Sequence, residues 1–156
     1  MNIVQFEKTD TEEIVALFYN TVHTICVDDY SNEQLNAWAP LSEVESKIEN
    51  WSTSLSENIT YVAKKDASIV GFADLTYDGL LDRLYVHKDF QCLGIASTLL
   101  AKLESAAIQL KMLEIKTYAS ITAKPFFENH DYTCIHRNTV ERNGTILTNF
   151  YMKKTL

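Results

Sequence analysis

The chain has 156 residues, 46% of them apolar, which suits one domain with its own core rather than two of ordinary size. Its 14 basic and 21 acidic side chains give a net charge of −7, which disfavours nucleic acid or an anionic membrane as a partner and favours a cationic one. The three cysteines have no metal-ligand spacing, no apolar run approaches the roughly 20 residues of a membrane span, and residues 2–7 lack the features of a signal peptide. We therefore expect a single cytoplasmic domain over residues 1–156, a monomer or homodimer that holds no metal.

The N-terminal third predicts one strand followed by helices. Residues 3–6 suit a short strand, and the Thr9-Asp10 pair can cap the helix that apolar spacing predicts over residues 11–25. Residues 31–38 fit a short helix, and residues 42–55 fit a third one.

Beyond residue 59 the spacing of apolar residues changes, and alternation indicates strands. In chain order the expected elements are strands over 60–64, 68–77 and 81–87, a helix over 95–110, a strand over 113–119, a short helix around Phe126 and Phe127, and strands over 132–141 and 145–153. Short turns join the first three strands into an antiparallel meander, and Asn143-Gly144 predicts a hairpin. The strand over 113–119 follows a strand–helix unit, so it should run parallel to residues 81–87. The chain is therefore expected to form a mixed α+β sheet.

The stretch from Leu80 to Leu110 carries the clearest functional signal. An apolar strand segment runs into a helix whose expected core face consists of Ile95, Leu99, Leu103, Ala106 and Leu110. The turn over residues 91–96 lies between them and leaves several backbone N–H groups without helical partners at the positive end of the helix dipole. Because phosphates bind at such positions, we interpret the turn as a pyrophosphate cradle.

This turn and its flanks resemble a known family. Gln91, Gly94 and Ala96, in the form Q-x-x-G-x-A after an L-Y-V strand, resemble the acetyl-coenzyme A (acetyl-CoA) loop of the GNAT acetyltransferases. Residues 69–72 resemble the strand before that loop, and residues 123–132 resemble the family's A-x-x-F-Y-E-x-x-G-F segment. The resemblance implies a GNAT-like fold with one central, mostly antiparallel sheet of about seven strands flanked by helices, whose parallel central strands splay apart around the pantetheine arm. It also implies that acetyl-CoA is the co-substrate and that a primary amine of a small molecule or protein attacks it directly.

The same resemblance implies which residues hold acetyl-CoA. A backbone N–H of the stretch Leu84, Tyr85 and Val86 would stabilise the developing oxyanion. The expected contacts are Gln91, Cys92, Leu93, Gly94, Ile95 and Ala96 in the loop, the hydroxyls of Ser97 and Thr98, and Ser120 and Phe127 farther along the chain. A plain helix surface explains Ser97 and Thr98 equally well.

Two positions depart from the family pattern. Phe127 stands where many members carry a tyrosine that protonates the leaving thiolate, and a phenyl ring has no proton to donate. Ser120 replaces the usual asparagine with a shorter hydrogen-bonding group. A thiol with a pKa of about 8.5 leaves as a tolerably stable thiolate, so the missing tyrosine need not abolish transfer. The alternative function is a GNAT-fold module that binds CoA without transfer, as a sensor or partner subunit.

The acceptor must lose a proton, because an alkyl amine titrates near about 10.4. Asp82 is the first candidate base, since strict alternation places it on the strand face of Leu84 and Val86, a few residues before the thioester site. The competing interpretation is an ordinary surface or ion-paired aspartate beside Arg83. The second candidate is His23, late in the first helix, because an imidazole titrates near neutrality; such a histidine more often ends a helix with no chemistry.

The acceptor pocket is expected to come from the N-terminal helices. The candidate substrate-binding residues are Asp28, Asp29, Tyr30 and Trp38, because two acids and an indole can hold a cation through charge and cation–π contact. A solvated loop and a core-packed tryptophan would explain the same residues. The run over residues 30–40 also resembles a bacterial subgroup of the GNAT family, but it names no substrate.

Overall fold

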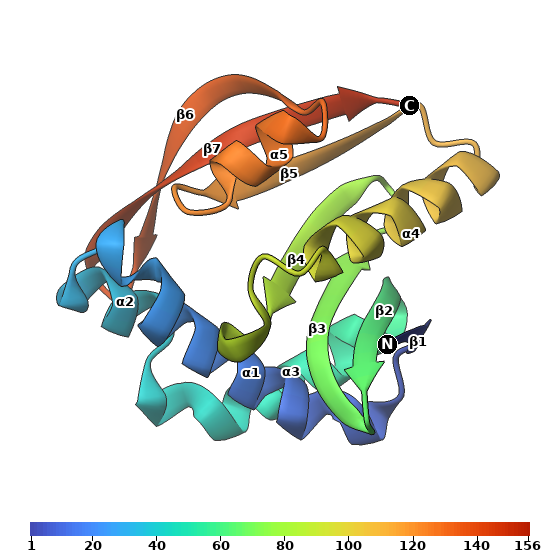
Figure 1. Ribbon diagram of the computed structural model, residues 1–156. Coiled ribbons are helices and arrows are strands. Elements are labelled where there is room, and N and C mark those ends of the chain that lie inside the picture. The colour runs from blue at the N-terminus through green and yellow to red at the C-terminus, as the bar shows by residue number, and fades with distance from the viewer.

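The computed structural model describes all 156 residues. Its elements in chain order are β1 (Asn2–Gln5), α1 (Thr11–Ile25), α2 (Asn32–Trp38), α3 (Val44–Glu57), β2 (Ile59–Lys65), β3 (Ser68–Leu75), β4 (Leu80–Val86), α4 (Ile95–Gln109), β5 (Glu114–Ser120), α5 (Lys124–Asn129), β6 (Thr133–Arg142) and β7 (Thr145–Thr155), as Figure 1 shows. Every element expected from the sequence is present. None of the helices is both long enough and apolar enough to cross a membrane.

The strands form one sheet of seven in the order β1-β2-β3-β4-β5-β7-β6, and only β4 and β5 are parallel neighbours. The mixed, mostly antiparallel sheet is therefore confirmed. β4 and β5 pair at two positions alone, Leu80 with Lys116 and Leu81 with Thr117. Beyond these residues the two strands diverge and leave an opening in the middle of the sheet, which confirms the expected splay (Figure 1).

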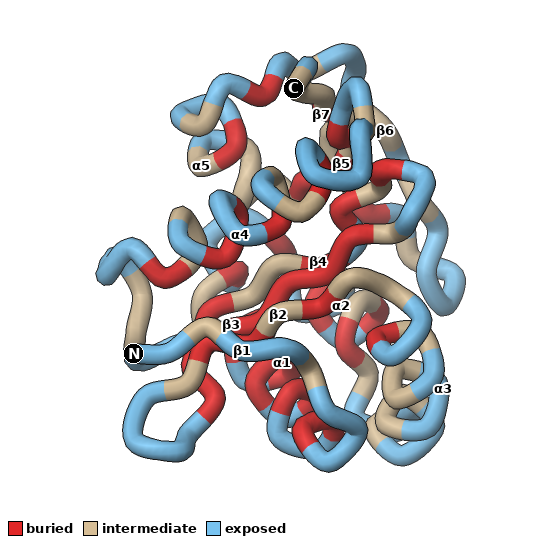
Figure 2. The backbone as a smooth tube through the Cα atoms, turned by 90° about the vertical axis from the view of Figure 1, so that its right-hand side faces the viewer, coloured by how far each residue is buried: buried red, intermediate tan, exposed pale blue.

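Helices cover both faces of the sheet and divide the core into two clusters of 16 buried residues each. One cluster joins α1, α2 and α3 to the sheet and includes Ile14, Val22 and Phe72. The other joins α4 and α5 to the opposite face and includes Leu103 and Ile115. Buried residues follow the central strands and the inner sides of the helices in Figure 2, while the outer turns are exposed.

The buried face of α4 differs from the expected one. Leu100 and Ala107 are fully buried, whereas Leu110 lies past the helix end and is 51% exposed. Ala106 is only half-buried. A helix that packs on a sheet buries a stripe wider than one row of residues, so the predicted row was incomplete. It was wrong at its C-terminal end, because the helix ends at Gln109.

Gly71 in β3 allows α4 to approach the sheet closely. A Cβ atom at this position would lie 3.0 Å from Ile95 Cγ2 and 3.1 Å from Leu99 Cδ1. Real side chains avoid contacts this short, so a larger residue would push the first turns of α4 away from β3. This packing fixes the start of α4 beside the end of β4.

Candidate active site

The turn between β4 and α4 presents a row of free backbone donors. The N–H groups from Cys92 to Ser97 donate to no protein acceptor, and the first donor of the turn that does so is Thr98, to the carbonyl of Gly94 at 3.0 Å. Two residues of the turn, Cys92 at φ 60° and Gly94 at φ 81°, have left-handed backbone. This conformation turns successive N–H groups toward one side at the positive end of α4, which suits a pyrophosphate.

The Gln91 side chain closes the turn onto β4 and does not point to the phosphate position. Its Nε2 donates to the carbonyl of Val86 at 2.8 Å and to that of His87 at 3.4 Å. The Thr21 hydroxyl of α1 donates to the same Val86 carbonyl at 2.9 Å. Gln91 therefore positions the loop, and α1 is tied to the same point.

The open edge of β4 offers two more backbone donors. His87 N–H donates to the carbonyl of Val70 at 2.8 Å, and the register pairs Val86 with Gly71 and Leu84 with Ala73. In an antiparallel ladder hydrogen-bonded pairs alternate, so the N–H groups of Leu84 and Val86 point away from β3 and into the opening. Tyr85 N–H points the other way, toward β3. Of the three residues expected to supply the oxyanion donor, only Leu84 and Val86 therefore have an N–H group that points into the opening.

Two cavities meet at this opening. The larger cleft, of about 930 Å³, is lined by α2, α3, β4, β5 and the β6–β7 hairpin, and the loop-side cavity, of about 330 Å³, by the end of α1, the residue 90–97 turn and α5. The residues that line both are Trp38, Leu84, Tyr85, Ser120, Ala123 and Phe127. A long substrate can therefore extend from the phosphate-binding turn through the sheet opening into the larger cleft.

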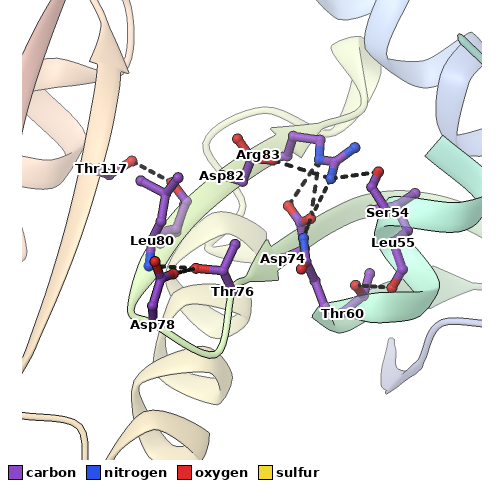
Figure 3. Close-up of polar contacts among 12 residues, drawn as sticks. Ser54, Leu55, Thr60, Asp74, Thr76, Asp78, Leu80, Asp82, Arg83 and Thr117 are labelled. Atoms are coloured by element: carbon purple, nitrogen blue, oxygen red, sulfur yellow. Dashed lines mark hydrogen bonds and ion pairs between the residues drawn. The ribbon is translucent and has the colours of Figure 1, made fainter. Parts of the chain in front are cut away.

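Asp82 lies in the larger cleft, at an irregularity of β4. Leu75 pairs with Leu81 but Asp74 pairs with Arg83, so Asp82 is an extra residue in the ladder, a β-bulge. Its carboxylate lies 3.3 Å from the Arg83 guanidinium and is 47% exposed. Figure 3 draws the two neighbouring side chains on β4. Strict alternation, on which the placement of Asp82 on the face of Leu84 rested, does not hold here, because the bulge adds one residue to β4.

Arg83 anchors this region through a buried ion pair. Its guanidinium donates to both carboxylate oxygens of Asp74, at 2.7 Å in the shortest contact, and to the Ser54 hydroxyl at 3.0 Å (Figure 3). Asn58 donates to Asp74 at 2.9 Å. Burial raises the pKa of the Asp74 carboxyl, and the Arg83 charge opposes that rise. The pair ties β3, β4 and α3 together directly beside Asp82.

The residues that depart from the family pattern lie at the junction of the cavities. Phe127 is 3% exposed and packs edge-on against Phe126 with 5.3 Å between ring centroids. The Ser120 hydroxyl accepts a hydrogen bond from Ala123 N–H at 3.0 Å, and its own proton is donated to no protein group. A hydroxyl that is free to donate therefore stands in the wall where a tyrosine is absent.

The two hydroxyls at the start of α4 differ in position. Ser97 lines the loop-side cavity, 3.0 Å from His130 Nε2 of α5. The other ring nitrogen, Nδ1, lies 2.8 Å from the Phe126 carbonyl and must carry a proton, so in the neutral ring Nε2 accepts from Ser97. Thr98 lines neither cavity, and its hydroxyl donates to the Gly94 carbonyl at 2.9 Å. Leu93 is 65% exposed and also lines neither.

Of the residues expected to bind the acceptor, two reach the larger cleft. Tyr30 and Trp38 line it, with their ring centroids 5.2 Å apart. The Tyr30 hydroxyl also donates to the Thr148 carbonyl at 2.7 Å and accepts from Ile121 N–H at 2.9 Å, so it joins the loop after α1 to β7. Asp28 and Asp29 line neither cavity, and Asp29 accepts a hydrogen bond from Thr122 at 2.7 Å.

His23 lies outside both cavities. Its Nε2 is 2.7 Å from the Ala39 carbonyl and must donate to it, because a carbonyl only accepts. The ring stacks on Tyr19 with 6.4 Å between centroids. The structure thus does not bring His23 together with Asp82.

Sequence reasoning missed two cationic residues of the larger cleft. Lys47 of α3 and Arg142 at the end of β6 both line it. The spacing of four residues between Lys47 and Trp51 places both on one helix face and is the signal that points to Lys47. Arg142 is far from the other site residues in sequence, and only the folded hairpin brings it to the cleft.

Comparison with known proteins agrees with this geometry. The acetyltransferase (GNAT) domain family matches residues 26–156. The uncharacterized N-acetyltransferase YafP of Escherichia coli K12 is 32% identical over 156 residues, which cover 98% of this chain and 97% of that protein.

Solved structures give the same result. A GCN5-related N-acetyltransferase from Rhodopseudomonas palustris is 34% identical and superposes with a TM-score of 0.92, covering 99% of this chain and 95% of the other. The PaiA N-acetyltransferase of Thermoplasma acidophilum, solved with coenzyme A, shares the fold at 20% identity and a TM-score of 0.73, covering 99% and 98%. The chain therefore belongs to the GNAT family and is an acetyl-CoA-dependent acyltransferase.

Proposed function

We propose that this protein, as a single domain over residues 1–156, transfers the acetyl group of acetyl-CoA to a primary amine that enters through the larger cleft. The observation that carries the proposal is the meeting of the two cavities at the opening between β4 and β5. Acetyl-CoA supplies the activated acetyl group as a thioester. The free N–H groups from Cys92 to Ser97 bind its pyrophosphate, and the opening orients its thioester end toward the cleft.

Backbone groups of β4 stabilise the charge that develops on the acetyl carbonyl oxygen. The N–H groups of Leu84 and Val86 point into the opening and are held by the ladder with β3. Because these donors are already oriented, they need no rearrangement when the charge forms. Gln91 and Thr21 keep the end of the strand in place through the Val86 carbonyl.

Asp82 accepts the proton of the acceptor amine, directly or through water. Its carboxylate faces the larger cleft and is half-exposed, so an ammonium group can approach it. His23 is less well placed for this role, because it lies outside both cavities and donates to the Ala39 carbonyl. Ser120, whose hydroxyl proton is free, donates a hydrogen bond to the leaving thiolate where a tyrosine is absent.

The composition of the chain supports proposals about its location, its oligomeric state and the kind of acceptor. We infer a cytoplasmic protein that acts as a monomer or homodimer, and an acceptor that is a small molecule or protein amine rather than nucleic acid or a membrane. The net charge of −7 supports this choice, because it repels polyanions.

The test is release of free CoA thiol from acetyl-CoA in the presence of a panel of primary amines, with the acetylated product identified by mass spectrometry. The proposal predicts that thiol release and N-acetyl product rise together with at least one amine. Binding of acetyl-CoA with no amine-dependent thiol release across the panel would contradict it and would favour a CoA-binding module that does not transfer.

A further inference from the structure

The charges of the larger cleft differ from those of the chain as a whole. Three cationic residues, Lys47, Arg83 and Arg142, line it together with three acids, Asp82, Glu43 and Glu141. The chain as a whole carries a net charge of −7. The residues that line the cleft thus carry as many positive as negative charges. The net charge of the chain alone would instead predict an acidic site for a cationic acceptor.

Lys47 holds a partly buried ammonium group without an acidic partner. Its Nζ lies 5.4 Å from the ring centroid of Phe18 and 5.4 Å from that of Trp51. It makes neither an ion pair within 4.0 Å nor a hydrogen bond, although other lysines such as Lys154 do. Burial lowers the pKa of Lys47, while the nearby Glu43 raises it and the charges of Arg142 and Arg83 lower it further. An anion bound here would offset the energetic cost of burying the ammonium charge and would reduce the repulsion between the cations.

Arg142 and Arg83 differ in what they can offer a ligand. The Arg83 guanidinium already forms ion pairs with Asp74, at 2.7 Å, and with Asp82, at 3.3 Å. Arg142 is exposed, its side chain forms no ion pair or hydrogen bond, and it lies close enough to Lys47 to affect the pKa of that lysine. The capacity of the cleft to bind an anion therefore resides in Lys47 and Arg142.

Lys47 and the arginine beside Asp82 lie against the same ring, that of Trp51. Arg83 Cζ lies 4.8 Å from the Trp51 ring centroid, against the same indole that Lys47 contacts, and Arg83 carries Asp82 beside it. A zwitterionic acceptor can therefore place its amine at Asp82 and an anionic group at Lys47. We propose that the acceptor is an amine that also bears a carboxylate, and that Lys47 and Arg142 bind this carboxylate. This inference rests on the acetyl transfer proposed above.

The test compares acceptors that differ only in this charge. ω-Amino carboxylates of three to six carbons are assayed beside their carboxamides, with free thiol as the readout. For at least one chain length the acid should have a kcat/KM at least about tenfold above that of its amide, because a charge-assisted contact is made only by the acid. Lys47→Met should reduce this ratio to near one through a higher KM for the acid, and Lys47→Arg should retain it.

Lys102→Met is the matched control. Lys102 Nζ also lies 5.4 Å from an aromatic ring, that of Tyr61, but it is on α4 and lines neither cavity. This variant should keep the wild-type ratio. Arg142→Gln, at an exposed position, provides a second variant with an intact fold if Lys47→Met does not fold, and it too should lower the ratio.

A binding measurement separates failure of this inference from failure of the acetyl transfer. The N-acetylated ω-amino carboxylates and their amides are titrated calorimetrically into the protein with CoA present. Tighter binding of the acid, lost in Lys47→Met, supports the carboxylate site even if no amine is acetylated, in which case only the transfer proposal fails. Equal binding of acid and amide overturns the carboxylate site, and so does equal acetylation of both by the wild-type protein.

Discussion

At the scale of single residues, the chemistry depends on how Asp82 is presented. Asp82 lies at a bulge of β4 and lines the larger cleft, with its carboxylate 3.3 Å from the Arg83 guanidinium. Arg83 is itself fixed by Asp74, which is fully buried. The two aspartates thus share one arginine, but one of them is available to a ligand and the other is not.

Asp82→Asn keeps the shape of the side chain and removes its basicity. We expect turnover at neutral pH to fall by roughly 10² or more while acetyl-CoA binding persists. The loss should shrink as the pH approaches the pKa of the acceptor amine, because solvent then supplies the free amine. A rate profile over pH, together with a thermal-shift titration of acetyl-CoA, checks both parts.

The controls for Asp82 are residues with other roles. Asp74→Asn breaks a buried ion pair and should lower the free energy of unfolding by about 3–5 kcal/mol, whereas Asp82→Asn should change it by only about 0.5 kcal/mol. His23→Ala should retain wild-type turnover, because His23 lies outside both cavities. An equal, pH-dependent loss in His23→Ala would move the role of the base to α1.

Phe127→Tyr restores the hydroxyl found in many family members. The ring is kept and its position lines both cavities, so the added hydroxyl has space and acetyl-CoA affinity should change by less than about twofold. Phe72→Tyr is the contrast, because Phe72 is fully buried away from both cavities and a hydroxyl there should destabilise the fold. A large loss of acetyl-CoA binding in Phe127→Tyr would show that this residue does not lie beside the thiol.

At the scale of elements, the turn before α4 and the opening beside it form one unit. Gly71 lets α4 approach β3, Gln91 closes the turn onto β4, and the left-handed backbone of Gly94 orients the free N–H groups. The donors from Cys92 to Ser97 therefore depend on backbone geometry rather than on charged side chains. This explains how a chain with a net charge of −7 can bind a pyrophosphate.

Gly94→Trp and Gly144→Trp form a matched pair for the turn. Both glycines have positive φ, 81° and 79°, and a Cβ atom at either meets nothing within 4 Å, so both variants should lose stability to a similar extent through backbone strain. Only Gly94→Trp places an indole where the pyrophosphate binds. The rise in melting temperature with acetyl-CoA should disappear in Gly94→Trp and remain in Gly144→Trp. An undiminished rise in Gly94→Trp would refute the cradle.

At the scale of the whole molecule, the sequence predicted the elements and the sheet because these follow from local patterns. Alternation and the Asn143-Gly144 turn predicted the hairpin of β6 and β7, and the strand–helix unit predicted the parallel pair of β4 and β5. The extent of the splay was implied only by the family resemblance. The bulge at Asp82 was not predictable, because it arises from the pairing of β4 with β3.

Some features of the candidate site were likewise predictable from local sequence, and others depend on the folded chain. The free N–H groups of the turn were expected, because a glycine before a helical pattern specifies them locally. The charges of the larger cleft were not, since Lys47 and Arg142 are almost a hundred residues apart in the sequence and only the folded chain places α3 and the β6–β7 hairpin at the same cleft. The net charge of the chain alone therefore does not predict which charged residues line this cleft.

A crystal structure of the protein with acetyl-CoA bound would show whether the substrate passes from the turn through the opening between β4 and β5. We expect the pyrophosphate at the N–H groups of Cys92 to Ser97 and the thioester oxygen within hydrogen-bond distance of Leu84 or Val86 N–H, with the acetyl group facing the larger cleft on the side of Asp82. Acetyl-CoA bound elsewhere, or a thioester that does not enter the opening, would contradict this expectation.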